Sequence, residues 1–461
     1  MENFWDYSVW GTLNVIALLL GALLAANVIK KAIKPLQASL IPTSVLGGLL
    51  LLVVTGVYKW ASDGNELFDA QFFGSDGTQT LEMLTYHCLA LGFIASTFKT
   101  SDGKLTKQRT VEILNTGVTT VSTYVIQAIV GLGITMLVAM FVKDFFSAAG
   151  VLLPFGYGQG TGQALNYGNI YETEHGFVGG KSFGLTIAAL GFLSASIGGV
   201  IHLYILKRKG LIKKGDWEQL RNQEPIESEN EIPMQESIDK MTIQIALIIV
   251  AYMATYGIMS LLGTFLPGMR SLIFGFNFLI GVLSATMIKG LLGVFKKTRI
   301  LKKEYTNNFL LTRASNFFFD LMVVSGIAAI RLSVLQQYWG IILVLGVAGL
   351  LVTYFYNRLV VKTLFKDYPE EQFLMMYGML TGTASTGIIL LREIDGEFKT
   401  PAADNMVYQN FPAIVLGFPI MLLATMAPEK PMLTLGLLVV FFVVLTVILF
   451  RSKIFCRRKK K

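Results

Sequence analysis

The stretch LPFGYGQGTGQALNYG, residues 153–168, lies between two long apolar runs and has glycine at alternate positions from 156 to 162. Glycine readily adopts backbone conformations that a regular helix does not use. Backbone that leaves a helix at membrane depth is tolerated only where protein buries it or where it lines a wet cavity. If a membrane surrounds this stretch, it is therefore a predicted break with a functional purpose.

The composition indicates a membrane protein. Of the 461 residues, 53% are hydrophobic and only 15% are charged, and the mean hydropathy is +0.58. A soluble chain usually carries about 25% charged residues. A transmembrane helix needs about 20 mostly apolar residues, and about eleven runs meet that criterion. The predicted spans are residues 8–33, 39–58, 81–98, 112–141, 181–206, 241–265, 272–295, 315–335, 340–361, 404–426 and 432–450.

Basic residues cluster in alternate loops between these runs, and the net charge is +9. Short loops rich in Lys and Arg stay in the cytoplasm, so the alternation predicts an external N-terminus and a cytoplasmic C-terminus. The charge is then explained by orientation and by contact with anionic membrane lipid, and no nucleic-acid partner is expected. The basic clusters occupy residues 30–34, 99–109, 207–214, 296–303, 358–366 and 451–461.

A polar segment divides the chain. Residues 207–240 are predicted to be a cytoplasmic linker between a first half, 1–206, and a second half, 241–427, with an extra helix and basic tail at 428–461. Two halves with five spans each have opposite orientations, which is the arithmetic of an inverted repeat. We therefore predict an all-α polytopic membrane protein with two inverted five-helix repeats.

The glycine-rich stretch has a counterpart in the second half. FGYGQGTGQA (155–164) and YGMLTGTAST (377–386) share one pattern: an aromatic residue and glycine, three intervening residues, and then Gly-Thr followed by a small residue. We expect two re-entrant hairpins, near 147–168 and 370–391, that enter the membrane from opposite sides. Their tips would approach one another near the midplane, because each hairpin returns to the side from which it came.

The expected hairpin tips offer groups for an ion and an anionic solute. Exposed carbonyls suit a hard cation such as Na⁺, and free amides at a helix N-terminus suit a carboxylate. The alternative interpretation is that Gly-Thr runs only pack helices tightly. The candidate solute-binding residues are Gln159, Gly160, Thr161, Gly162, Thr381, Gly382, Thr383, Ser385, Thr386 and Arg392, and the candidate Na⁺ ligands are Gly158, Thr161, Asn166, Ala384 and Asp320.

Ionisable residues inside spans are functional candidates because they are costly to bury in lipid. For Asp320 the sequence leaves two roles open, binding of Na⁺ or an ion pair with Arg313. For Arg392 it also leaves two, a bidentate contact with a solute carboxylate or a local ion pair with Glu393. His202, near the end of a span, is expected to reach out to the membrane surface. The sequence has no catalytic or metal-ligating set of the kind an enzyme needs, so no enzymatic activity is expected.

Four stretches resemble those of bacterial sodium/glutamate symporters: IPTSVLGGLL (41–50), GQGTGQA (158–164), GLTIAALGFLSASIGGVI (184–201) and TGTASTGIILLREIDGEFKTPAA (381–403). The resemblance implies Na⁺-coupled glutamate uptake across a bacterial inner membrane. It also implies a homodimer in which a transport domain moves past a scaffold. The chain departs from the Gly-Gly-His-Gly-Thr motif of that family, with Tyr157 and Gln159 in place of the first glycine and the histidine.

The predicted function is therefore secondary active transport: Na⁺-coupled symport of glutamate, or of a related amino acid or dicarboxylate, by an elevator-type mechanism. Related families built on the same plan carry citrate and other carboxylates, so two alternatives remain. One is a Na⁺- or H⁺-coupled carrier of citrate or malate. The other is a passive channel or exchanger on the same fold.

Overall fold

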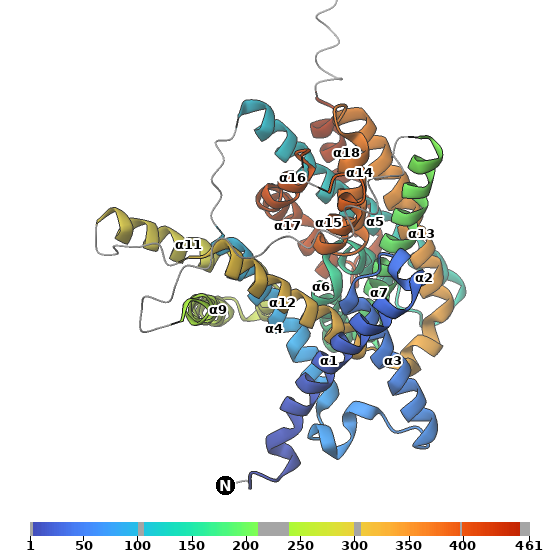
Figure 1. Ribbon diagram of the computed structural model, residues 1–461. Coiled ribbons are helices and arrows are strands. Elements are labelled where there is room, and N and C mark those ends of the chain that lie inside the picture. The colour runs from blue at the N-terminus through green and yellow to red at the C-terminus, as the bar shows by residue number, and fades with distance from the viewer. Residues whose placement is uncertain (1–2, 100–105, 211–238, 299–305, 397–398, 452–461) are drawn as a thin grey trace, which may run out of the picture. The chain divides into compact units, whose positions relative to one another are not determined.

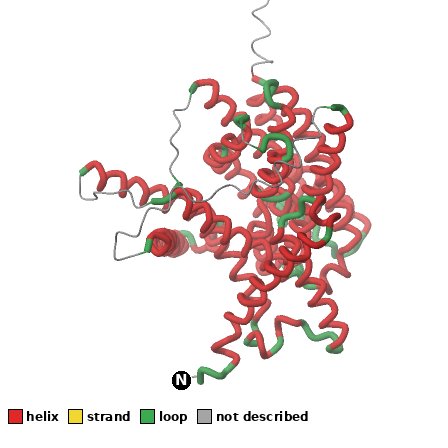
Figure 2. Tube along the Cα trace, in the orientation of Figure 1, coloured by secondary structure: helices red, strands yellow, loops and turns green. Residues whose placement is uncertain are grey.

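A computed structural model of the chain describes residues 3–99, 106–210, 239–298, 306–396 and 399–451. Within these ranges every regular element is a helix, as Figure 2 shows. In the described part of the chain, ten helices are long and apolar enough to cross a membrane, and eleven if the bent pair α16 and α17 forms one span. The prediction of an all-α polytopic membrane protein is confirmed. Most of the predicted linker, at 211–238, and the tail, at 452–461, lie outside the described residues.

The chain divides into two compact units, and each unit takes segments from both predicted halves. The first unit comprises Met1–Leu20, Phe68–Lys104 and Gln223–Ser325, and the second comprises Gly21–Leu67, Leu105–Asn222 and Gly326–Lys461.

The first unit is a small helical cluster built around α4. Its main elements are the first part of α1 (Tyr7–Ala32), α4 (Gly77–Phe98), α9 (Lys240–Phe265), α10 (Arg270–Gly275), α11 (Asn277–Lys297) and α12 (Asn308–Ala328) up to Ser325. Apolar side chains of α4, α9, α11 and α12, among them Ile94, Ile248, Ala285 and Leu311, form its core. A Cβ on Gly92 of α4 would lie 2.7 Å from the ring of Phe319, so this glycine permits close packing of α12.

The second unit contains both glycine-rich stretches. Its elements are the rest of α1, α2 (Lys34–Ala38), α3 (Thr43–Ala61), α5 (Lys107–Phe141), α6 (Leu152–His175), α7 (Gly180–Arg208), α13 (Leu332–Leu364), α14 (Pro369–Thr381), α15 (Ala384–Arg392), α16 (Ala402–Tyr408), α17 (Asn410–Met426) and α18 (Pro431–Leu449) (Figure 1). Helix α7 packs against α6, α13, α14 and α15.

A row of glycines on α7 explains this close packing. Gly184, Gly191 and Gly198 are seven residues apart, which is about two helical turns, so they share one face. A Cβ on Gly184 would lie 2.5 Å from the carbonyl oxygen of Ala164, and one on Gly198 would collide with the hydroxyl of Tyr377. Small residues let helix backbones approach closely in membranes. Helix α7 therefore supports α6 and α14 directly by its backbone.

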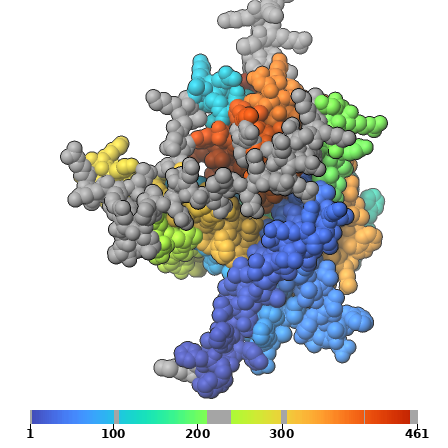
Figure 3. All heavy atoms as spheres, in the orientation of Figure 1, coloured from blue at the N-terminus to red at the C-terminus, as the bar shows by residue number. Residues whose placement is uncertain are grey.

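Several helices keep large apolar side chains on the outside. On α1, Leu24 is 68% exposed and Val28 is 65% exposed, and this helix lies at the surface in the space-filling view of Figure 3, in dark blue. Exposed apolar side chains on a helix that is apolar on all faces are typical of lipid contact. The surface of these helices thus agrees with a membrane environment.

The structure corrects the boundary between two predicted spans. The sequence predicts spans at 315–335 and 340–361, whereas α12 ends at Ala328 and α13 starts at Leu332. The intervening residues Ala329 and Ile330 are buried, and the backbone N–H of Arg331 donates to Ser182 Oγ at 3.1 Å. Ala329 and Ile330 are as apolar as the helices on either side, so a hydropathy window places the boundary several residues too late.

Candidate functional site

Helix α6 is broken at Gly160 and folds back on itself. Gly160 has φ +79° and ψ −171°, a backbone conformation that is essentially confined to glycine. Phe155 before the break stacks on Tyr167 after it, with ring centroids 3.8 Å apart. Further out, Phe146 stacks on Phe177 at 4.6 Å. The two arms therefore lie side by side with Gly160 at their tip, and we call α6 the first broken segment.

Helices α14 and α15 form a second broken segment with the same character. The break falls at Gly382 and Thr383, and the Thr383 hydroxyl accepts a hydrogen bond from the backbone N–H of Thr386 at 3.2 Å, which caps α15. A Cβ on Gly387 would lie 2.5 Å from the carbonyl oxygen of Met375. This contact between residues twelve positions apart shows that α14 and α15 also lie side by side.

The tips of the two segments meet on α7. A Cβ on Gly191 would lie 2.5 Å from the Thr381 carbonyl oxygen of the second broken segment. The same Cβ would lie 3.2 Å from Tyr157 Cα of the first. One glycine of α7 thus contacts both broken segments, one next to its break and the other about one helical turn before it, and the similar motifs at 155–164 and 377–386 come together in space.

The residues predicted on the first broken segment surround its break. Thr161, Gly162 and Asn166 are buried, and Gln159 is partly exposed. The Gly158 carbonyl accepts a hydrogen bond from the Tyr124 hydroxyl at 3.0 Å. A carbonyl oxygen has two lone pairs, so the hydrogen bond from Tyr124 does not by itself exhaust the capacity of this oxygen to accept.

Thr161 also packs against the last turn of α12. A Cβ on Gly326 would lie 2.7 Å from Thr161 Cβ, so a glycine at this position again allows the approach. The break at Gly160 is therefore supported from two directions, by α7 and by the end of α12.

The residues predicted on the second broken segment differ in exposure. Thr381, Gly382 and Thr386 are buried, Thr383 is partly buried, and Ala384 and Ser385 are exposed. The Thr381 hydroxyl donates to the Tyr377 carbonyl of its own helix at 2.6 Å. Arg392 is the last residue of α15, about 12 Å from the break at a rise of 1.5 Å per residue. The structure thus places Arg392 away from the tips.

Tyr157, which departs from the family motif, has its hydroxyl fully engaged. The hydroxyl donates to the Gly346 carbonyl of α13 at 2.6 Å, and the Ser194 hydroxyl of α7 lies 2.9 Å away. The side chain is buried. Tyr157 therefore ties the first broken segment to α7 and α13.

Two polar residues of the first unit, the predicted Na⁺ ligand Asp320 and His87, lie on helices α12 and α4. Asp320 is on α12, and its side chain is exposed; the assignment of Asp320 to Na⁺ remains a prediction. His87 on α4 has its Nδ1 2.6 Å from the Tyr252 hydroxyl of α9. That hydrogen bond gives His87 a packing role between α4 and α9.

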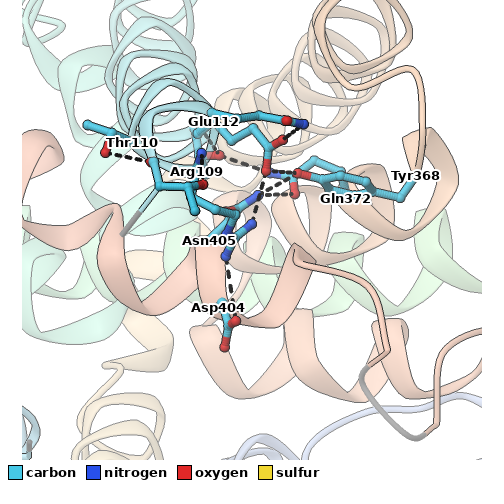
Figure 4. Close-up of polar contacts among 10 residues, drawn as sticks. Arg109, Thr110, Glu112, Tyr368, Gln372, Asp404 and Asn405 are labelled. Atoms are coloured by element: carbon cyan, nitrogen blue, oxygen red, sulfur yellow. Dashed lines mark hydrogen bonds and ion pairs between the residues drawn. The ribbon is translucent and has the colours of Figure 1, made fainter. Parts of the chain in front are cut away.

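The base of the second broken segment is fixed by a polar network, shown in Figure 4. The Tyr368 hydroxyl, just before α14, donates to the Glu112 carboxylate of α5 at 2.8 Å. Asn405 of α16 donates to the Tyr368 oxygen at 3.0 Å and to Gln372 at 3.2 Å. Arg109 bonds Glu112 at 3.0 Å. The network joins α5, α14 and α16 far from the tip.

A second cluster holds the other side of α14. Arg358 of α13 makes two hydrogen bonds to the Glu370 carboxylate, at 2.5 and 2.6 Å. His202 Nε2 lies 2.9 Å from the same carboxylate, and because a carboxylate only accepts, Nε2 donates. Burial alone raises the pKa of Glu370, but the hydrogen bonds from His202 and Arg358 outweigh it and hold the pKa at about 2. His202 is 2% exposed, so the prediction that it reaches the membrane surface is wrong.

One residue that the sequence analysis did not select stands out at the first break. Gln163 is 1% exposed, and within the described part of the chain neither its amide nitrogen nor its amide oxygen has a hydrogen-bond partner. The available signal was its position three residues after Gly160. A glutamine in a polar stretch does not by itself indicate a binding residue. Only the structure shows that the amide of Gln163 is both buried and without a hydrogen-bond partner among the described residues.

The fold and these two broken segments define the class: an integral membrane protein with many spans and two helix breaks that meet inside one unit. A sequence model of the sodium/glutamate symporter family matches residues 8–394. The chain belongs to the sodium/glutamate symporter family. A comparison with curated protein sequences finds no significant match.

Proposed function

We propose that this protein imports glutamate, or a related amino acid or dicarboxylate, by symport with Na⁺. The observation that carries the proposal is the meeting of the two broken segments on Gly191. Helix breaks at the membrane midplane are where secondary transporters bind solute and coupling ion. Membership of the sodium/glutamate symporter family supplies the ion and the solute class.

In this proposal the two broken segments are re-entrant hairpins of two inverted repeats, 1–206 and 241–427, that enter the membrane from opposite sides. Na⁺ binds at the Gly158 carbonyl, which also accepts a hydrogen bond from Tyr124, and the N-terminus of α15 offers its positive end to a carboxylate. Na⁺ and an anionic solute then stabilise one another across the tips. This mutual stabilisation is the physical source of coupling.

The same proposal includes the remaining features of the family plan. The N-terminus is outside and the C-terminus is in the cytoplasm of a bacterial plasma membrane, with lipid around the exposed apolar helices. The protein is a homodimer, and the part that holds both broken segments moves across the membrane relative to the rest. Basic loops on one side support this orientation.

The test is uptake of labelled L-glutamate into proteoliposomes with and without an inward Na⁺ gradient. Accumulation that requires Na⁺ and is blocked by unlabelled L-glutamate would support the proposal. Accumulation of citrate or malate instead would contradict the glutamate assignment. Equilibration of solute without Na⁺ and without accumulation would show a passive pathway and contradict symport.

Matched threonine variants connect uptake to the break. Thr383→Ala removes a hydroxyl at the tip and is expected to lower uptake, while Thr383→Ser keeps the hydroxyl and restores it. Thr363→Ala is the control, because Thr363 is a partly exposed residue of α13 whose hydroxyl donates to the Leu359 carbonyl of its own helix. Loss of the N-cap costs about 1 kcal/mol, so thermal stability is measured for each variant alongside uptake.

A further inference from the structure

Gln163 on the second arm of the first broken segment is buried with an unsatisfied amide. Its side chain is 1% exposed, and within the described residues neither Nε2 nor Oε1 has a partner. A buried polar group without a hydrogen bond is destabilising, and most such groups in proteins are paired. The amide therefore requires an explanation outside the chain itself.

The backbone shows which way this amide points. The second arm begins at Gly160, where φ is +79°, so Gln163 is the third residue of the arm. Side chains in a helix lean towards its N-terminus. A glutamine at this third position normally reaches back to bond the N–H of the capping residue, and Gln163 does not make that bond. Its amide thus lies near the break with both ends unused.

The neighbouring residues on the same helix face do have hydrogen-bond partners, unlike Gln163. Tyr167 and Tyr171 follow Gln163 at intervals of four residues, so all three share one helix face. The Tyr167 hydroxyl donates to the Met421 carbonyl of α17 at 3.0 Å, and the Tyr171 hydroxyl donates to the Ala424 carbonyl at 2.7 Å. Only the member of this row nearest the break lacks a partner. The unpaired position is three residues from Gly160, the break at which the proposed function places the solute.

We propose that Gln163 contacts the transported solute and selects solutes that carry a protonated amine beside a carboxylate. Nε2 donates to a carboxylate oxygen, which the positive end of the second arm also favours. Oε1 accepts from the ammonium group. A dicarboxylate without an amine satisfies only the donor and leaves the acceptor buried and unpaired. This inference rests on the proposed function and adds a specificity-determining residue to it.

The experiment measures uptake of labelled L-glutamate into proteoliposomes with an inward Na⁺ gradient. Two competitors are compared: unlabelled L-glutamate, and glutarate, which lacks the amine. In the wild type L-glutamate is expected to compete better than glutarate. Gln163→Met keeps the length and removes both hydrogen-bonding atoms, so the ratio of the two inhibition constants is expected to fall by about tenfold or more, the effect of losing a buried partner. A ratio unchanged within about twofold overturns the inference.

A second variant tests the same inference without depending on correct folding of Gln163→Met. Gln163→Glu keeps an acceptor for the amine but repels a solute carboxylate, so affinity for L-glutamate is expected to fall about tenfold. Unchanged affinity in this variant also overturns the inference. Gln244→Met is the matched control, because Gln244 is equally buried but bonds the Lys240 carbonyl and the Asn307 N–H. It is expected to lower thermal stability and leave the ratio unchanged.

The outcomes separate the inference from the proposed function. Na⁺-driven L-glutamate uptake with an unchanged ratio in Gln163→Met would overturn the inference alone. Na⁺-driven uptake of a plain dicarboxylate with no response to any amino acid would overturn both the glutamate assignment and the role of Gln163. Absence of any Na⁺-driven uptake by folded wild-type protein would contradict symport itself and, with it, the inference.

Discussion

Gly191 of α7 lies in direct contact with Thr381 at the end of α14: a Cβ on the glycine would stand 2.5 Å from the threonine carbonyl oxygen. Tyr157 of the first broken segment lies on the same glycine, with its Cα 3.2 Å from that Cβ. Both breaks therefore depend on one position of α7. A change there moves both tips at once.

We expect Gly191→Ala to reduce Na⁺-coupled uptake strongly. The new methyl group meets backbone on two sides, and backbone atoms yield less readily than the end of a flexible side chain. The matched control is Gly133→Ala in α5, where a Cβ has nothing within 4 Å and alanine favours the helix. Full uptake by Gly191→Ala would show that the tips do not need this spacing.

Gly160→Ala should destabilise the protein through its backbone alone. The conformation at φ +79° and ψ −171° costs a residue with a side chain about 1–3 kcal/mol, while nothing lies within 4 Å of the added Cβ. The measurement is thermal unfolding in detergent together with uptake.

Gly176 provides the control for that variant. Its φ of 68° and ψ of 22° lie in the left-handed region, which asparagine tolerates. Gly176→Asn should therefore unfold close to the wild type, whereas Gly160→Asn should not. Equal stability of the two asparagine variants would contradict the break at Gly160.

Tyr157→Phe separates a structural role from a role in solute selection. Loss of the hydroxyl leaves the buried Gly346 carbonyl and the Ser194 hydroxyl without this partner, which we expect to cost about 1–2 kcal/mol of folding stability. The ranking of competing solutes should stay as in the wild type. A changed ranking with unchanged stability would place Tyr157 in the binding site.

The Glu370 cluster predicts a defined pH dependence. Its pKa of about 2 in the folded protein lies below the ordinary value of 4.5. The stabilisation is therefore fully present above about pH 4.5 and is lost as the pH falls towards 2. Glu370→Gln should lower the unfolding temperature by the same amount at every pH from about 5 to 8, and the difference should shrink below about pH 4.5.

Thermal unfolding of the wild type and Glu370→Gln over this range is the check. Removing the carboxylate leaves Arg358 and His202 without their negatively charged partner. We expect the free energy of unfolding to fall by about 1–3 kcal/mol. A difference that already fades between pH 8 and pH 6 would mean that Glu370 titrates near neutrality and that the described ion pair is not formed.

Much of the fold could be predicted because its signals are local. The long apolar runs are found as helices, and the glycine-rich stretches at 155–164 and 377–386 are found at breaks. The turn between α12 and α13 could not be predicted, since Ala329 and Ile330 are buried and apolar like the helices around them. The buried pairing of His202 with Glu370 was also missed, because the two residues are 168 positions apart.

The sequence by itself determined the membrane class, the family and the positions of the two breaks. These properties follow from hydropathy and from the conformational freedom of glycine, which are properties of single residues and short windows. Tertiary structure decided which groups remain available. Tyr157 proved to be tied to α7 and α13, Arg392 proved to be distant from the tips, and Gln163 proved to be buried with an unused amide. Hydrogen-bond satisfaction depends on neighbours from distant parts of the chain, so no local pattern encodes it.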